Sequence, residues 1–374
     1  MAYQNVSTPR FYVSILQWLK SLGMASYYTG ADFTPLGDAS SLLEINPSST
    51  ITFKPTGSGS YDNMSFQTDM PLGTIMPPSQ NFFMVLGHNF RSAEVSDLIV
   101  RNNAPSDEVC TEGVVNEISG GAHNGFTIMK GDDADNIAGD YLVFTFDGVD
   151  ASTPDIKIGS LLYGNYYNMP VSPNLNLTLT REYGGVDELT TIDGSTISNA
   201  TWTSPPKWGN LPQWTQRDSP NPLFNFATGR RVWNLSFSYM SDSDVWSSNE
   251  SLSNWSGDWA PENGEDYSGY YKPMYTYEGY EGANESGGDI RWVNTTLPGD
   301  WNLGFNYNLL TDDSFYSQVW HKTLGGTLPF IFQADGDNNN VDQFAICKFR
   351  DNSLKVTQTA FNVYDISLII EEVW

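Results

Sequence analysis

The sequence has few of the residues that carry most metal and enzyme chemistry. Among 374 residues there are two cysteines, Cys110 and Cys347, and three histidines, His88, His123 and His321. No histidine has another histidine, a cysteine or a carboxylate at the spacing of a metal site, so the sequence predicts no metal centre. Two cysteines so far apart are typical of buried thiols, and we expect no disulfide between them.

Sequence motifs for catalysis are also missing. The chain has no Gly-x-Ser-x-Gly nucleophile elbow, no phosphate-binding loop and no dinucleotide fingerprint. The acidic run 335–342 begins like a calcium loop, but Asn340 and Ile346 stand where such a loop needs Gly and Glu, so a hairpin turn is the better interpretation. We therefore expect no cofactor and no enzyme activity.

Positive charge and long apolar runs are scarce. Lys and Arg total 18 against 44 Asp and Glu, a formal net charge of −26. Such a surface repels phosphate backbones and anionic membranes, so we expect no nucleic-acid recognition. No stretch approaches the roughly 20 apolar residues of a membrane helix, and residues 1–6 lack the start of a secretion signal. We expect a soluble chain made in a cytosol, with no membrane insertion.

Apolar and aromatic residues are plentiful, at 39% and 14% of the chain, and the length predicts two domains. Between residues 42 and 180, short apolar or alternating runs are separated by the residues of turns. These predicted strands are residues 49–54, 81–87, 97–101, 125–130, 141–146 and 155–163. Short strands without a long helix between them predict a β-sandwich or jelly roll.

The sequence allows more than one interpretation of the N-terminal segment, and it predicts where the two domains meet. Leu16, Leu19 and Leu22 recur at helical spacing, and Gly23 is placed to end a helix. Residues 1–23 are therefore an N-terminal arm or short helix, and a strand that opens into a short helix is the alternative. Two prolines near residues 169–174 predict a boundary between a sandwich domain, 24–173, and a second β domain, 174–374.

The second domain is also expected to be β. Residues 175–181 and 230–239 alternate apolar and polar side chains, which predicts half-buried strands. Residues 315–335 predict a short helix, a Gly-Gly turn and a strand, and residues 342–350 and 364–374 predict two more strands. The C-terminus would then complete a sheet with one helix on it. Glu371 and Glu372 would point to opposite faces of that sheet and could not form a catalytic pair.

A long loop insertion is predicted at residues 242–300, where aromatic residues are interleaved with Gly, Ser, Asn and acids. Its candidate contact residues for a partner or a glycan are Trp246, Trp255, Trp259, Tyr270, Tyr271, Tyr275 and Tyr277. Such rings suit sugars or protein grooves, but packing on their own subunit or on its neighbour in an oligomer is the interpretation that we prefer. Glu262, Glu265 and Asp266 lie among them, yet no spacing selects the acid pair of a glycosidase.

His88 also allows two interpretations. It follows the apolar run 81–87, which reads as a buried strand. Its ring could hydrogen-bond a neighbouring loop as part of the structure, or it could contact a ligand. The structural role is the one we expect.

Several segments resemble virion proteins of marine bacteriophage tails. They are residues 81–93, 158–170, 181–186 with 204–209, 231–237 and 315–374. The resemblance implies a jelly-roll, discoidin-like sandwich followed by a tail-ring β domain, comparable to distal tail proteins. It implies a homo-oligomer, a hexameric ring on the tail tube that connects to hub or fibre proteins in the virion. A glycan-binding adhesin or receptor-binding protein of the tail is the alternative, and the aromatic insertion departs from a minimal ring domain.

A ring around a tube fits the chemistry of this chain. Closed cyclic assemblies with head-to-tail contacts need extended surfaces with open strand edges, not a deep pocket. An acidic inner wall would let DNA slide through without sticking. We therefore expect acids of the second domain to line the lumen of such a ring.

Overall fold

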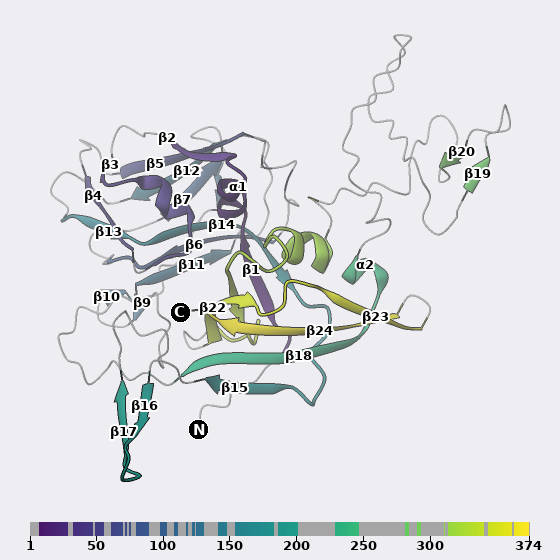
Figure 1. Ribbon diagram of the computed structural model, residues 1–374. Coiled ribbons are helices and arrows are strands. Elements are labelled where there is room, and N and C mark those ends of the chain that lie inside the picture. Colours follow the sequence, from purple (N-terminus) through teal and green to yellow (C-terminus); the bar gives the residue numbers. More distant parts are fainter. Residues whose placement is uncertain are drawn as a thin grey trace.

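The computed structural model describes a defined part of the chain. The described residues are 7–28, 33–47, 49–55, 61–69, 72, 75, 80–89, 98–102, 108–110, 117–118, 122–123, 125–130, 141–147, 154–182, 186–200, 229–246, 281–283, 290–292, 310, 313–339, 343–360 and 363–373. This part is mostly β and consists of several antiparallel sheets, which confirms the predicted fold class (Figure 1).

A ten-stranded antiparallel sheet runs through the molecule. In spatial order its strands are β11 (Phe126–Lys130), β6 (Asn81–Leu86), β14 (Ser160–Asn168), β1 (Arg10–Ser14), β21 (Phe330–Gln333), β22 (Phe344–Phe349), β24 (Val363–Glu372), β18 (Arg230–Met240) and β15 (Thr178–Glu182). The tenth strand, β23 (Lys355–Ala360), pairs with β24 beside this path.

Smaller sheets surround the large one. A five-stranded sheet has the order β2 (Ala25–Tyr28), β5 (Tyr61–Thr68), β12 (Tyr141–Asp147), β7 (Leu98–Asn102) and β8 (Glu108–Cys110). A three-stranded sheet consists of β13 (Ile156–Ile158), β4 (Ile51–Pro55) and β3 (Phe33–Leu36). Three hairpins are β9 (Glu117–Ile118) with β10 (Ala122–His123), β16 (Val186–Thr190) with β17 (Thr196–Ala200), and β19 (Glu281–Ala283) with β20 (Ile290–Trp292).

The N-terminal segment is a central strand that opens into a helix, which was the alternative prediction for it. Strand β1 pairs with β14 on one side and with β21 on the other, so Tyr12 lies opposite both Tyr166 and Ile331. Helix α1 (Ile15–Ser21) follows directly, and the Ser14 hydroxyl caps it by accepting a hydrogen bond from the Gln17 amide. Through β1, one sheet continues across the boundary predicted near residues 169–174, and that boundary stays a prediction.

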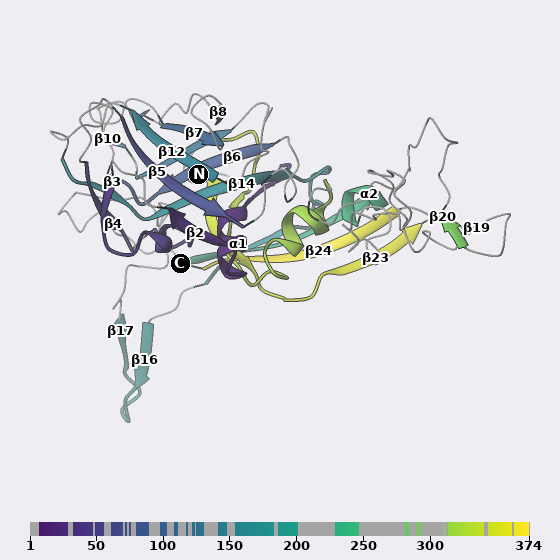
Figure 2. The same ribbon diagram turned by 90° about the horizontal axis from the view of Figure 1, so that it is seen from above.

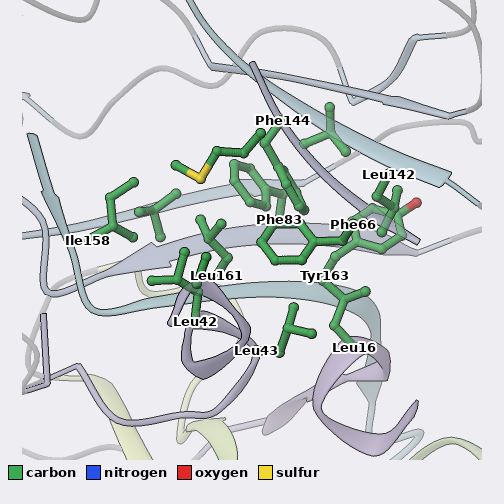
Figure 3. Packing of buried hydrophobic residues seen from close by; sticks show 14 of the residues in the cluster. Leu16, Leu42, Leu43, Phe66, Phe83, Leu142, Phe144, Ile158, Leu161 and Tyr163 are labelled. Carbon is green, nitrogen blue, oxygen red and sulfur yellow. The ribbon is translucent and has the colours of Figure 1, made fainter. Parts of the chain in front are cut away.

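The sandwich core explains the fully apolar run at residues 82–86. Alternate residues of a strand face opposite sides, so Phe83 and Val85 join one cluster while Phe82 and Met84 join another on the reverse face. Phe83 meets Phe144 of the five-stranded sheet with ring centroids 4.8 Å apart (Figure 3). Every residue of β6 is buried because both faces of the large sheet are covered.

Residues 315–374 contain the predicted helix, turn and three strands in the predicted order, and one strand that was not predicted, β23, lies between the last two. A π-helix, η6 (Tyr316–His321), packs on the large sheet and is followed by a turn and by β21. Gly325 and Gly326 form this turn with φ of +65° and +84°. A Cβ on Gly326 would stand 2.8 Å from the Phe349 Cβ, so glycine is required there for space as well as for conformation. The two other helices among the described residues are short: η1 (Ala39–Leu43) is a 3₁₀ helix and α2 (Asp242–Val245) follows β18.

Ion pairs join β15, β18 and β24 with Arg350, the residue after β22, at one end of the large sheet. Glu371 and Glu372 point to opposite faces, as predicted: Glu371 meets exposed Arg350 at 2.9 Å, whereas Glu372 meets buried Arg231 at 3.0 Å. Arg350 also contacts Glu182 of β15 at 3.0 Å. The buried pair was not predicted, because a carboxylate and a guanidinium separated by 141 residues carry no local signal.

Strand β15 departs from its prediction. The expected strand at residues 175–181 was to be half-buried, but β15 begins at Thr178 and most of its side chains are exposed. Leu175 lies outside the strand and is fully exposed. The physical reason is the position of the strand in the sheet. An alternating sequence gives a half-buried strand only if other residues cover one face of the sheet, and β15 lies at the edge. There, Leu177 and Leu179 are only partly buried.

Candidate functional site

Of the seven predicted aromatic contact residues, the structure describes one. Trp246 follows α2, is half-buried and packs against a cluster of buried side chains that includes Phe315, Val319 and Trp320. Its ring lies 5.4 Å from the ring of Tyr316 on η6. This favours the interpretation in which the ring packs on its own subunit. The residues that lie outside the described part are Trp255, Trp259, Tyr270, Tyr271, Tyr275, Tyr277, Glu262, Glu265 and Asp266. Their roles stay predictions.

His88 has a structural position. It is buried, its Nε2 lies 2.9 Å from the Thr127 hydroxyl of β11, and its amide donates to the Gly125 carbonyl. The ring therefore holds β11 against the end of β6, as the structural interpretation expected. His321 of η6 contacts the Trp18 ring, and burial lowers the pKa of this histidine. The side chain of His123 lies outside the described part.

Metal-ligating and thiol groups do not converge where the structure can be described. Within those residues, no three His, Cys, Asp or Glu side chains gather as a metal site would require. Cys347 of β22 is a buried free thiol, and burial raises its pKa well above the usual value. No helix in the described ranges is long and apolar enough to cross a membrane.

Within the described strands, β15 is one edge of the large sheet, and no further strand pairs with its outer side. Among the described strands it pairs only with β18, from Thr178 opposite Asn234 to Glu182 opposite Arg230. The Glu182 carboxylate is held by Arg230 at 2.8 Å and by Arg350 at 3.0 Å, and these hydrogen bonds lower the pKa of Glu182. The one acid of this edge is therefore neutralised, and its charge does little to keep another strand away.

The hairpin of β16 and β17 is a second exposed feature, and its turn is encoded locally. Asp193 and Gly194 occupy the tip, where Gly194 has φ of +83° and its amide donates to the Thr191 carbonyl at 2.9 Å. The Thr191 hydroxyl donates to the Asp193 carboxylate, and the Ser195 amide donates to the same carboxylate. These bonds lower the pKa of Asp193, so the tip carries a fixed negative charge. Asp-Gly between alternating residues is a strong hairpin signal, and it could have found this element.

The hairpin exposes aliphatic side chains instead of burying them. Leu189 and Ile197 face each other across the two strands and are 66% and 55% exposed, while Ile192 at the tip is fully exposed. Residues 186–200 include three acids and no Lys or Arg. Figures 1 and 2 both show the hairpin extending away from the body of the molecule. The surface is therefore apolar and anionic, which is unusual for a side facing only water.

An open cleft of about 520 Å³ lies among α1, the segment after η1, the approach to β21, strand β22 and the residue that follows β24. It is lined by Gln17, Lys20, Ser21, Glu44, Ile45, Asn46, Leu328, Pro329, Lys348 and Val373. Two of these ten residues are lysines, although the chain is strongly acidic. Sequence reasoning missed the cleft because its residues come from five distant segments that only the folded chain brings together.

Both lysines of the cleft can bind an anion. The Lys20 ammonium donates to the Ser40 carbonyl at 2.7 Å and to Glu44 at 2.8 Å, which leaves one of its three protons. Within the described residues, Lys348 of β22 makes no ion pair. The cleft therefore combines available cationic donors with the apolar side chains of residues such as Leu328 and Val373.

A buried lysine on the π-helix is the remaining unusual group. The Lys322 ammonium is 3% exposed and donates to the Gln318 side chain at 2.7 Å. Burial lowers its pKa to about 7, an effect that the negative charge of Asp313 partly opposes. π-Helices occur often at functional sites, but the neighbours of this one are mainly core residues such as Phe315 and Val319. We assign Lys322 to the helix packing.

The described surface thus offers an open strand edge, an apolar acidic hairpin and a cationic cleft, and each is suited to binding protein surfaces. None of them brings a nucleophile, a general base and an oriented partner together. No family model, curated protein or solved structure matches this chain.

Proposed function

We propose that this chain is a structural protein of a bacteriophage tail, a distal-tail-like ring component of the tail tip or baseplate. In this proposal, copies of the chain form a closed ring, a homohexamer, on the tail tube and connect it to hub or fibre proteins. The observation that carries the proposal is the ten-stranded sheet that ends on an open, mostly exposed edge strand, β15.

An open edge is a place for another chain to pair. Proteins that stay monomeric usually protect such edges with proline, a bulge, a charged side chain or a covering segment. The five residues of β15, Thr-Leu-Thr-Arg-Glu, include no proline, and the register with β18 runs without a bulge. The edge acid, Glu182, is held by two arginines, so the exposed charge of β15 is that of Arg181. These features favour pairing with a second copy.

The apolar surface near this edge supports the same conclusion. Leu175, just before β15, is fully exposed, and Tyr239 on the neighbouring strand β18 is 85% exposed. Tyr239 also has φ of +64°, a backbone conformation that is uncommon for a tyrosine. Tyrosine is enriched at protein interfaces, where its ring gives a large contact area. A neighbouring subunit would cover both side chains.

The charge of the chain fits a position around DNA. A net charge of −26 repels a phosphate backbone, so a ring of such chains would let a genome pass without binding it. In the proposed ring, the N-terminal sandwich is a jelly-roll, discoidin-like module that faces outward, and acids of the second domain line the lumen. Neutralising lumen acids is then expected to slow genome passage in an infection assay, and unchanged ejection would count against the lumen assignment.

The mass of the assembled protein in solution tests the proposal. Native mass spectrometry of the full chain is expected to show a closed oligomer, and a labelled subunit is expected at the tail tip in images of the particle. Thr180→Lys places a charge on the open edge and is expected to weaken assembly. The control is Ser353→Lys, in an exposed turn before β23, which is expected to assemble normally. A monomer at every concentration, or a label on the capsid, would overturn the proposal.

A further inference from the structure

We propose that the hairpin of β16 and β17 is an assembly arm whose tip binds in the cationic cleft of a second copy of this chain. The inference rests on the proposed function, because it supplies one of the contacts between neighbours in the ring. It starts from two surfaces of the same chain that complement each other in charge and in polarity.

The hairpin needs a partner to cover its apolar side chains. Two-stranded hairpins without further packing are marginally stable in water. In the described sheets, β16 and β17 pair only with each other. Leu189 and Ile197 form a directly opposed pair on one face, and both are more than half exposed. Burial of this pair against another surface would stabilise the hairpin and the contact together.

The tip presents an aliphatic and an anionic group side by side. Ile192 is fully exposed, and Asp193 is held ionised by hydrogen bonds from Thr191 and Ser195. These bonds fix the direction of the carboxylate before any partner arrives, so little order is lost on binding. A site that accepts the tip must therefore provide an apolar pocket beside a cation.

The cleft provides both. Lys20 and Lys348 supply ammonium groups on opposite elements, α1 and β22, and Ile45, Leu328 and Val373 supply apolar contacts. Its volume of about 520 Å³ is within the range that holds several side chains. Glu44 also lines the cleft and pairs with Lys20 at 2.8 Å, so Lys348 is the lining cation without an ion pair among the described residues and is the group that the anionic tip would meet.

The contact belongs to two copies and not to one. In both views the hairpin extends away from α1, which lines the cleft, and Figure 1 shows that it also extends away from β22 (Figures 1 and 2). The two surfaces are different patches of one chain, so the contact is head-to-tail. Contacts of this type, repeated around an axis, close into a ring. The open edge of β15 and the hairpin then contribute to the same kind of assembly.

Inter-copy cross-linking tests the contact directly. In a Cys110→Ser background, one sample carries Ile192→Cys at the tip and a second carries Ser21→Cys in the cleft. The buried thiol of Cys347 is retained in both. When the two are mixed and oxidised, a disulfide between copies is expected to form about tenfold faster than in a control mixture, because binding raises the effective concentration of the two thiols. The control replaces Ile192→Cys with Leu36→Cys, an exposed leucine on β3.

Charge reversal gives an independent measurement. Lys348→Glu is expected to weaken assembly about tenfold or more, and adding Asp193→Lys to the same chain is expected to restore it, because the attraction is rebuilt with opposite signs. Leu189→Asp is expected to weaken assembly as well, whereas Leu36→Asp is the matched control. Rescue by the second change excludes misfolding as the cause of the first effect.

The outcomes separate this inference from the proposed function. If the ring forms but the tip and cleft cysteines cross-link no faster than the control, the hairpin contact is wrong and the ring stands on other contacts. If they cross-link but the full chain forms only open chains or dimers, the contact stands and the ring proposal fails. Reversal of Lys348 without effect on assembly also overturns the hairpin contact.

Discussion

Replacing Arg231 with methionine is expected to destabilise the protein more than any exposed arginine change. The Arg231 guanidinium donates through Nε and Nη2 to the two oxygens of Glu372, at 3.1 and 3.0 Å. The side chains of Arg231 and Glu372 are only 8% and 7% exposed. In the variant, Glu372 keeps the Arg231 backbone amide at 3.1 Å but loses the cation that balances its buried charge.

The magnitude follows from the burial of this pair. Removing one partner of a buried ion pair costs about 3–5 kcal/mol, because the remaining charge stays out of water uncompensated. Arg350→Met is the matched control. Arg350 is 39% exposed and pairs with Glu371 and Glu182 on the opposite face, so its loss is expected to cost about 1 kcal/mol.

A double variant separates the energy of the ion pair from the cost of burying one unpaired charge. Arg231→Met with Glu372→Leu removes both charges and is expected to be more stable than Arg231→Met alone, because no buried charge is left. Urea unfolding at constant pH measures the free energy of unfolding, and an unchanged slope confirms that the same surface unfolds. If Arg231→Met is within about 1 kcal/mol of Arg350→Met, or if the two single effects simply add, the reasoning is refuted.

Three further predictions concern single side chains. The pKa of Lys322 in the folded state, about 7, lies below its value in the unfolded chain. The unfolded chain therefore binds more protons between pH 7 and 9. In this range the free energy of unfolding rises with pH by at most about 1.4 kcal/mol per pH unit. Lys322→Met should flatten that rise in urea titrations at pH 6.5 and 9, and an unchanged rise would contradict the assignment. Cys347 is expected to react with a thiol reagent only after unfolding, because burial keeps its pKa high; peptide mass spectrometry before and after denaturant measures this, and labelling of the native protein would contradict it. Trp246→Ala is expected to lower the free energy of unfolding by about 1–2 kcal/mol, since the ring packs on Tyr316; a variant as stable as the parent would show that the ring faces a partner instead.

Some parts of the fold follow from short stretches of sequence. The apolar run 82–86 is a strand buried on both faces, and the Gly-Gly turn after η6 lies where the residue types place it. Glu371 and Glu372 separate to opposite faces because consecutive side chains on a strand alternate. Each of these features depends on residues within about one element, so local pattern is enough.

Features that depend on distant residues could not be predicted in the same way. The pairing of Arg231 with Glu372 joins residues that are 141 positions apart, and the cleft assembles Lys20 with Lys348. The exposed character of β15 was missed because alternation gives the two faces of a strand but not its place in the sheet. The hairpin at 186–200 is different, because the Asp193-Gly194 pair at its tip is a local signal from which a hairpin can be predicted.

The sequence by itself determined the mostly-β class, the buried central strands and the strongly acidic charge, because alternation, turn residues and composition are local or summed properties. The tertiary structure alone decided that β1 joins the two halves of the large sheet, that β15 is an open edge and that two lysines share one cleft. The order of strands in a sheet depends on which strands, far apart in the chain, pair with one another. It is fixed by which faces and edges bury one another when the whole chain folds.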